Sequence, residues 1–185
     1  MTAFLLFKFI YKPTVNAIKD DIYQGCINIQ IHGESKYSET IDSKNLIATM
    51  DALSSSKLSR ALILLHAYLN AKQTDLLPKT FDIEHIFPKK WQSANYQGWD
   101  EKAAQECLEL FGNKVAFEKK LNIQAGNDYF GKKKEKYIKS RIKDVLDLGK
   151  SPNNDWLERD IKQRNGLFLD TLAAYFETNL AKVKQ

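Results

Sequence analysis

The spacing of apolar and polar positions predicts a mainly helical chain. Apolar residues recur at helical intervals in the first third of the sequence and again near its end. The isoleucines at 27, 29 and 31 alternate with polar residues instead, which predicts a strand that ends at Gly33. The helices expected in this N-terminal part cover residues 2–24 with a break at Lys12-Pro13, residues 43–53 and residues 57–71.

The middle of the chain has a different pattern, in which two short strands precede a long basic helix. Residues 81–87 are expected to form the first strand, which ends where Pro88 begins a loop, and residues 113–117 the second. The other expected segments are a helix over 101–110 closed by Gly112, an irregular stretch over 119–126, a helix from an Asp128 cap to about residue 148, and a last helix with Ile161 and Leu172 among its apolar positions. The expected fold is therefore α+β and mainly helical, with a small hairpin-helix core surrounded by helices.

Length and composition limit the protein to a few classes. Its 185 residues are enough for one domain with a core, or for one domain and a small appendage. We expect a mostly helical scaffold segment over 1–56 and the hairpin-bearing domain over 57–185, or one continuous domain over 1–185. No apolar run approaches the roughly 20 residues of a membrane span, so no membrane partner is expected. The two cysteines lie far apart, which favours a reduced cytoplasmic protein.

The positive charge of the chain is concentrated in one region. The net charge is only +5, which is compatible with a nucleic-acid partner but not specific for one. From Lys114 to Lys150, however, eleven Lys and Arg face five Asp and Glu. The basic surplus therefore lies just after the first predicted strand.

The adjacent residues Glu84 and His85, followed by Pro88, are the most informative feature of the sequence. A carboxylate can hold a divalent metal ion, and a histidine can take a proton from water near neutral pH. Together these groups suggest metal-assisted hydrolysis of a phosphodiester. An isolated Glu-His pair is more often an ordinary surface pair, so the function depends on what the rest of the chain adds.

Further motifs follow the Glu-His pair in a fixed order. They are Gly112-Asn113, the N..F..K...Y..S pattern that starts at Asn127, and the W....I..R pattern that starts at Trp156. The set resembles the HNH nuclease superfamily, whose site is a β-hairpin packed on a helix around one metal ion. It resembles more closely the C-terminal nuclease domain of GmrSD-type, modification-dependent restriction endonucleases, over roughly residues 58–176.

This resemblance implies a role for each matching residue. His85 would be the general base, and Asn113 would tie the second strand to the loop that carries His85. Glu84 would hold the metal ion together with Asn122 or Asn127, and the resemblance does not decide between the two asparagines. Hard oxygen ligands in small number favour Mg²⁺, with Mn²⁺ as a substitute.

The basic residues after the pair are expected to contact DNA. Lys133 occupies the lysine position of the N..F..K pattern and is a candidate for a catalytic contact with the scissile or a neighbouring phosphate. General affinity for the DNA backbone, steeply dependent on salt, is expected from Lys132, Lys134, Lys136, Lys139 and Arg141.

The function expected is a metal-dependent DNA endonuclease of a restriction or defence system. Because the GmrSD-type systems pair this domain with an N-terminal nucleotide-hydrolysing domain and the chain has no Gly-rich phosphate loop, that partner is expected as another domain or subunit. A homodimer is also considered. Two alternatives remain: an inactive DNA-binding or assembly module of the same fold, and a helical interaction protein with Glu84 and His85 on its surface.

Overall fold

The chain folds into two compact units. The computed structural model describes residues 2–33, 39–92, 96 and 98–180. One unit, called here the helical unit, comprises Met1–Leu58 and Leu169–Gln185, and the other, the hairpin unit, comprises Ser59–Phe168. The long helix α9 (Glu158–Leu180) contributes its first part to the hairpin unit and its second part to the helical unit.

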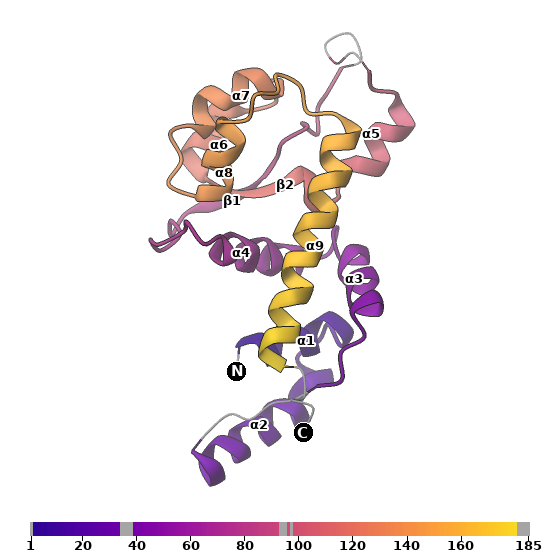
Figure 1. Cartoon of the computed structure of the whole chain (residues 1–185), viewed down its shortest axis with the longest axis vertical. Coiled ribbons are helices and arrows are strands. Elements are labelled where there is room, and N and C mark those ends of the chain that lie inside the picture. The colour runs from indigo at the N-terminus through magenta and orange to yellow at the C-terminus, as the bar shows by residue number, and fades with distance from the viewer. Residues whose placement is uncertain (1, 34–38, 93–95, 97, 181–185) are drawn as a thin grey trace. The chain divides into compact units, whose positions relative to one another are not determined.

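The described part of the helical unit consists mainly of helices (Figure 1). Its elements are α1 (Thr2–Tyr11), the short 3-10 helix η1 (Asn16–Ile18), α2 (Lys19–His32), α3 (Ser43–Ala52) and the end of α9. The predicted break near Pro13 and the helix predicted over 43–53 are confirmed. Asp42 caps α3 by accepting hydrogen bonds from the backbone N–H groups of Lys44 and Asn45. Phe7 and Phe176 pack against each other in the core of this unit.

The strand predicted over residues 27–31 is wrong, because these residues form the last turns of α2. Ile27, Ile29 and Ile31 are all exposed, so their alternation does not mark a buried face. Gly33 ends this helix with a positive φ of 67°, the left-handed conformation that glycine adopts without steric cost. A helix satisfies its own backbone hydrogen bonds, whereas an isolated strand would need a partner strand.

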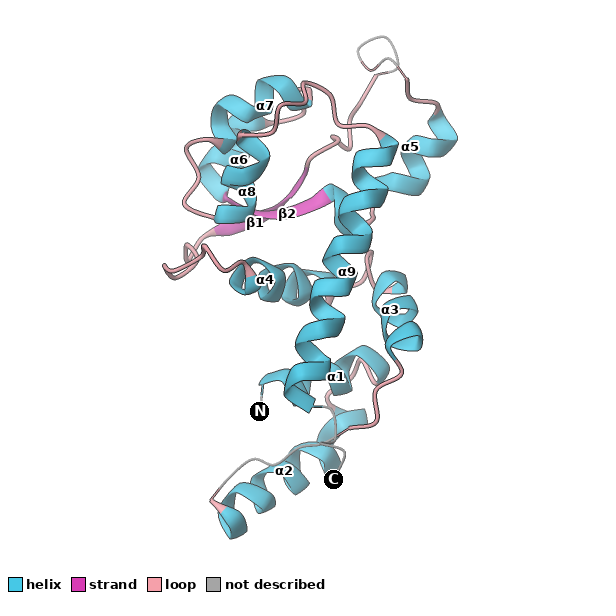
Figure 2. Ribbon diagram, viewed as in Figure 1, coloured by secondary structure: helices cyan, strands magenta, loops and turns pink. Residues whose placement is uncertain are grey.

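A two-stranded antiparallel hairpin lies at the centre of the hairpin unit. Strand β1 (Phe81–His85) pairs with β2 (Lys114–Glu118), with Phe81 opposite Glu118 and His85 opposite Lys114. Figure 2 shows the hairpin with α4 (Ser59–Leu69) on one side and α6, α7 and α8 on the other. The bounds of these last three are Lys119–Ala125, Phe130–Tyr137 and Lys143–Gly149. The prediction of a mainly helical α+β fold with a hairpin packed on helices is confirmed.

The connection between the two strands ends in a tight turn. It contains α5 (Glu101–Leu108), which Asp100 caps, and the 3-10 helix η3 (Phe111–Asn113). The expectation that Gly112 closes the helix before it is wrong, because α5 ends at Leu108 and Gly112 lies inside η3. A Cβ atom at Gly112 would overlap the carbonyl oxygen of Ile161 and lie 2.7 Å from the backbone nitrogen of Asn165. Glycine is therefore required here for the close approach of α9.

Two predictions for the segment after β2 are also wrong. Residues 119–125 are helical (α6) instead of irregular, and the long helix expected from Asp128 to residue 148 is divided into α7 and α8. The division occurs where Glu118 accepts hydrogen bonds from the Ser140 hydroxyl and from the Arg141 backbone N–H. Tyr129, and not Asp128, precedes α7 as its N-cap, without a side-chain hydrogen bond. Contacts with the end of β2 thus override the local helical pattern.

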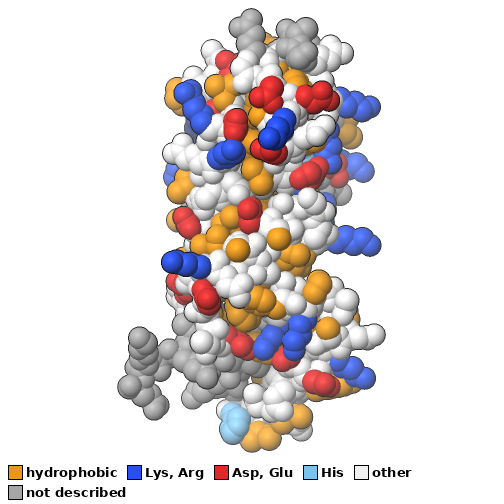
Figure 3. Space-filling view, turned by 90° about the vertical axis from the view of Figure 1, so that its right-hand side faces the viewer, with side chains coloured by type: hydrophobic (Ala, Val, Ile, Leu, Met, Phe, Trp, Pro, Cys, Tyr) orange, Lys and Arg blue, Asp and Glu red, His pale blue; other side chains and the backbone are white. Residues whose placement is uncertain are grey.

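The surface gives little information about partners by itself. Figure 3 shows one face of the molecule, on which acidic and basic side chains are intermixed and not separated by sign. None of the described helices is long and apolar enough to cross a membrane.

Candidate active site

Glu84 lies near the end of β1 in a buried ion pair. Its carboxylate oxygen Oε1 accepts a hydrogen bond of 2.7 Å from the Lys133 ammonium and another of 2.7 Å from the Tyr137 hydroxyl. The side chains of Glu84 and Lys133 are only 6% and 1% exposed. Lys133 also donates to the backbone carbonyls of His85 and Ile86, at 2.7 and 3.3 Å. One lysine of α7 therefore holds both the carboxylate and the chain that follows it.

Burial works against the charges of this pair. It raises the pKa of the Glu84 carboxyl, and attraction to Lys133 offsets this only in part. Burial likewise lowers the pKa of Lys133, although Glu84 acts in the opposite direction. Removal of either partner would leave the other charge buried and unpaired, which is costly in a low-dielectric interior.

His85 lies among charged groups of the loop before β2. Its Nε2 atom is 3.5 Å from Glu109 Oε1, which is too long for a full hydrogen bond, and makes no hydrogen bond within the described part of the chain. Glu109 also forms ion pairs with Lys89, at 3.1 Å, and with Lys114. Burial, with a contribution from the charge of Lys89, lowers the pKa of His85 to about 4 although Glu109 acts against it. His85 is therefore neutral at pH 7, as a general base must be.

Glu84 and His85 lie on different faces of the hairpin. The paired register continues to His85, so successive side chains alternate between the two faces. Glu84 accordingly contacts α7, whereas His85 lies beside Glu109, just after α5. A bend after Ile83 that would bring both side chains to one face is expected from the proposed chemistry, but β1 is regular in the structure.

Asn113 connects the second strand to the chain that follows His85. Its side-chain oxygen accepts a hydrogen bond of 2.7 Å from the Phe87 backbone N–H, and its amide donates to the carbonyls of Phe87 and Leu108 at 3.0 Å. Its own backbone carbonyl accepts from the Ile86 N–H at 2.9 Å. Asn113 is fully buried, so these bonds are protected from water. Arg164 holds the same turn by donating to the carbonyls of Phe111, Gly112 and Lys114.

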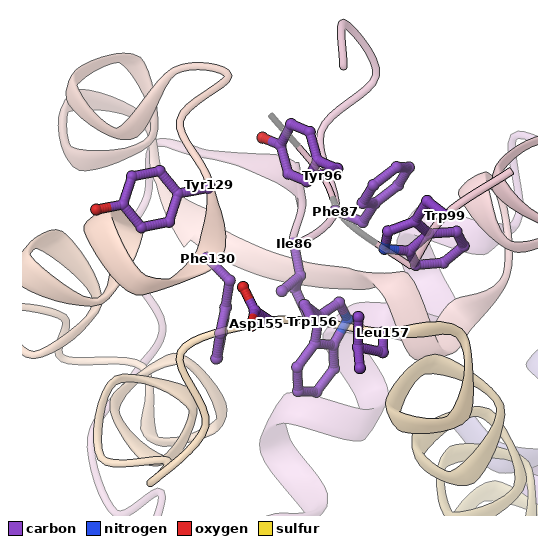
Figure 4. Close-up of a pocket in the computed structure, with 9 residues that line it drawn as sticks. All are labelled: Ile86, Phe87, Tyr96, Trp99, Tyr129, Phe130, Asp155, Trp156 and Leu157. Carbon is purple, nitrogen blue, oxygen red and sulfur yellow. The ribbon is translucent and has the colours of Figure 1, made fainter. Parts of the chain in front are cut away.

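The residues directly after His85 enter an aromatic pocket (Figure 4). Phe87 stacks on Trp99 with ring centroids 4.3 Å apart, and Phe130 packs against Trp156 at 5.0 Å. The free space is about 10 Å³, which is room for about one water molecule. The buried indole nitrogen of Trp156 has no hydrogen-bond partner among the described residues. A water molecule in this space would accept a hydrogen bond from it. This packing fixes the chain after the Glu-His pair.

The predicted metal ligands differ in burial. Asn122 lies half-buried on α6, and Asn127 is exposed in the turn before α7, where its side-chain oxygen lies 3.4 Å from the backbone nitrogen of Lys90. Within residues 2–33, 39–92, 96 and 98–180, no group of three or more His, Cys, Asp and Glu side chains is placed to hold a metal ion.

The predicted DNA-contacting residues lie on α7 and in the turn after it. Lys132, Lys139 and Arg141 are exposed, whereas Lys134 and Lys136 are half-buried. Lys132 pairs with Asp128 at 3.1 Å, and Lys134 donates to the carbonyl of Asn153 at 2.9 Å. Lys133 faces inward, so a contact with phosphate stays a prediction that would require it to leave Glu84.

A comparison with known families places this site in context. The family model of the C-terminal domain of GmrSD restriction endonucleases matches residues 27–171. The chain belongs to this family. No curated protein and no solved structure gives a significant match. Membership in the GmrSD family indicates a nuclease role in restriction and implies a divalent metal, DNA as substrate and companion N-terminal domains.

Sequence reasoning missed several groups that surround the pair. Glu109 and Lys114 were not singled out, although Lys114 lies directly opposite His85 in the hairpin register. That position follows from the backbone bond between Ile86 and Asn113, the two residues that flank the paired region, and the sequence did not reveal this register. Nothing in the sequence marks Glu109 beyond its place four residues before Asn113. Tyr137 matches the tyrosine position of the N..F..K...Y..S pattern, and it lies in the core with its hydroxyl bonded to Glu84.

Proposed function

We propose that this domain is an HNH-type, metal-dependent DNA endonuclease in which His85 is the general base. The observation that carries the proposal is the Asn113 clamp. Two side-chain hydrogen bonds and one backbone bond of Asn113 fix the chain directly after a half-buried, neutral histidine. Such fixation is what a base needs, because proton transfer requires a defined ring position.

His85 is suited to take a proton from water. Its low pKa keeps the imidazole unprotonated at neutral pH, and Nε2 is free of a full hydrogen bond. The nearby Lys89 and Lys114 add positive charge on the side where a phosphodiester would approach. These features support attack by water on a phosphate next to His85.

The proposed ligands are oxygen donors of the type that Mg²⁺ takes, with Mn²⁺ as a substitute. The candidate ligands are the Glu84 carboxylate and the amide oxygen of Asn122 or Asn127, and Mg²⁺ keeps several waters and needs few protein oxygens. The hydrogen bonds from Lys133 and Tyr137 to Glu84 end on Oε1, so these two residues would act as outer partners that orient the carboxylate. When bound, the ion would stabilise charge on the leaving oxygen.

The metal requirement can be tested by DNA cleavage. The chain, alone and with its companion N-terminal domain, is incubated with duplex DNA in Mg²⁺, Mn²⁺ or EDTA. Cleavage in both metals and none in EDTA is expected. Undiminished cleavage in EDTA would refute metal dependence.

We further propose that the companion is a nucleotide-hydrolysing domain and that two copies act together when both strands are cut.

A second candidate function is a DNA-binding or assembly module that no longer cuts. The observation that favours it is the Lys133–Glu84 pair, which neutralises the proposed metal ligand. This alternative predicts salt-sensitive binding of DNA without cleavage in any metal, with or without the companion domain. The two candidates therefore give opposite results in the same assay.

A further inference from the structure

The ammonium groups of Lys89 and Lys114 and the ring of His85 converge on a single carboxylate, that of Glu109. Glu109 Oε1 lies 3.1 Å from the Lys89 ammonium and 3.5 Å from His85 Nε2, and Glu109 Oε2 pairs with the Lys114 ammonium. They come from separate elements, since His85 ends β1, Lys114 begins β2, Lys89 lies in the loop after β1 and Glu109 follows α5. Two ammonium groups from separate elements thus face one anionic group next to His85.

Glu109 and its two lysine partners differ in how far their side chains are exposed to solvent. The Lys114 side chain is only 4% exposed, so its ammonium is held in place beside His85. The Glu109 side chain is 38% exposed and that of Lys89 is 56% exposed. Partial burial alone would raise the pKa of Glu109, but hydrogen bonds from Lys114 and Lys89 outweigh it and hold the pKa at about 2. Glu109 is thus charged at neutral pH, and its side chain borders the solvent.

We infer that Lys89 and Lys114 bind a backbone phosphate of DNA next to His85, and that Glu109 occupies this phosphate site when no DNA is bound. A carboxylate and a phosphodiester each present two anionic oxygens to charged donors, so one can replace the other. The inference rests on the proposed function only in taking DNA as the ligand. It assigns the phosphate contact nearest His85 to residues outside the basic stretch on α7.

The inference predicts that removal of the Glu109 charge strengthens DNA binding. Glu109→Gln no longer competes with phosphate, so it should bind a fluorescent DNA duplex roughly two- to fivefold more tightly than the parent, the range expected from a partly exposed ion pair. Binding is measured by anisotropy in EDTA, so the result does not depend on cleavage. Glu106→Gln is the matched control, because it makes the same charge change nearby on α5 and its side chain is 56% exposed and pairs with Lys102. Equal affinities of the Glu109 and Glu106 variants would overturn the inference.

Lys89→Gln tests the same site from the cation side and leaves Glu109 paired with Lys114. This variant should weaken DNA binding and reduce the slope of log affinity against log salt by about one. Lys102 is the matched control, because its side chain is 88% exposed on α5, and Lys102→Gln should leave the slope unchanged.

If Glu109→Gln fails to fold, as circular dichroism would show, the Lys89 variant decides. An unchanged slope for Lys89→Gln, or no DNA binding by the parent at low salt, would overturn the inference. Tighter binding by Glu109→Gln without cleavage in Mg²⁺ would refute the nuclease function but not this site.

Discussion

The Lys133–Glu84 pair couples stability to the candidate active site at the scale of single residues. Lys133 donates hydrogen bonds to the Glu84 carboxylate, the proposed metal ligand, and to the carbonyls of the two residues that follow it. The same side chain therefore positions the carboxylate and the backbone of the candidate active site. The pair is almost fully buried, and neither charge has access to water as a substitute partner. The stability of the fold therefore depends on both members.

Replacing Lys133 should destabilise the protein strongly. Lys133→Met keeps most of the side-chain volume but leaves Glu84 charged and buried without its partner, which costs about 3–5 kcal/mol. Urea unfolding followed by circular dichroism measures the change. Lys132→Met is the matched control: Lys132 is exposed, its pair with Asp128 is a surface pair, and the expected change is within about 0.5 kcal/mol. Equal stabilities of the two variants would contradict the assignment of Lys133 as a structural partner of Glu84.

The acid limb of the pH–rate profile should reflect the low pKa of His85. A base works only when unprotonated, so activity is lost as pH falls through its pKa. With the pKa at about 4, kcat/KM should stay constant from neutral pH down to about pH 5 and fall below it. Steady-state cleavage across this range, with folding checked at each pH, is the measurement. A fall centred near the unperturbed value of about 6.5 would mean that His85 is not shielded as described.

At the scale of elements, the turn η3 sets the position of Asn113. Two neighbouring residues of α9 hold this turn. Arg164 donates to the carbonyl of Phe111, and the side-chain oxygen of Asn165 accepts from the Gly112 N–H at 3.0 Å. Because α9 passes so close to Gly112, the turn and the first part of the helix behave as one packed element.

A methyl group at Gly112 should disrupt this element. Gly112→Ala would overlap the backbone of Ile161, so either α9 or the turn must move, and we expect a loss of more than about 2 kcal/mol of stability together with reduced cleavage. Gly166→Ala is the control on α9: nothing lies within 4 Å of the added Cβ atom, and alanine should stabilise the helix by about 0.5–1 kcal/mol. Thermal unfolding of both variants gives the answer. We expect the two substitutions to change stability in opposite directions. A Gly112→Ala variant as stable as the parent would contradict the close packing of α9 on the turn.

The sequence predicted those elements whose signals are local. The two strands of the hairpin and the break at Pro13 follow from alternation and proline chemistry, and the family resemblance singles out Asn113, directly before β2. The division between α7 and α8 could not be predicted, because Glu118 on β2 caps the turn from 22 and 23 residues away. Nor could the partner of Glu84, since Lys133 is 49 residues distant and spacing does not reveal which lysine faces inward. The helical state of residues 27–31 was missed because period-two alternation occurs by chance in exposed helices.

At the scale of the whole molecule, the family match extends over both compact units. It begins in α2 of the helical unit and ends in α9, whose second part belongs to the same unit. The helical unit is therefore at least partly a feature of the family and not an addition to it. Its first helix and the turn after it lie before the matched region.

The central claim is that His85 removes the proton from the attacking water. The most direct test is the single-turnover rate of DNA cleavage in Mg²⁺ by the parent, His85→Ala and the exposed control His32→Ala, all with the companion domain present. We predict that His85→Ala cuts roughly 10²–10⁴-fold more slowly while binding DNA as tightly as the parent, and that His32→Ala is unchanged. Cleavage by His85→Ala at the parental rate would contradict the account.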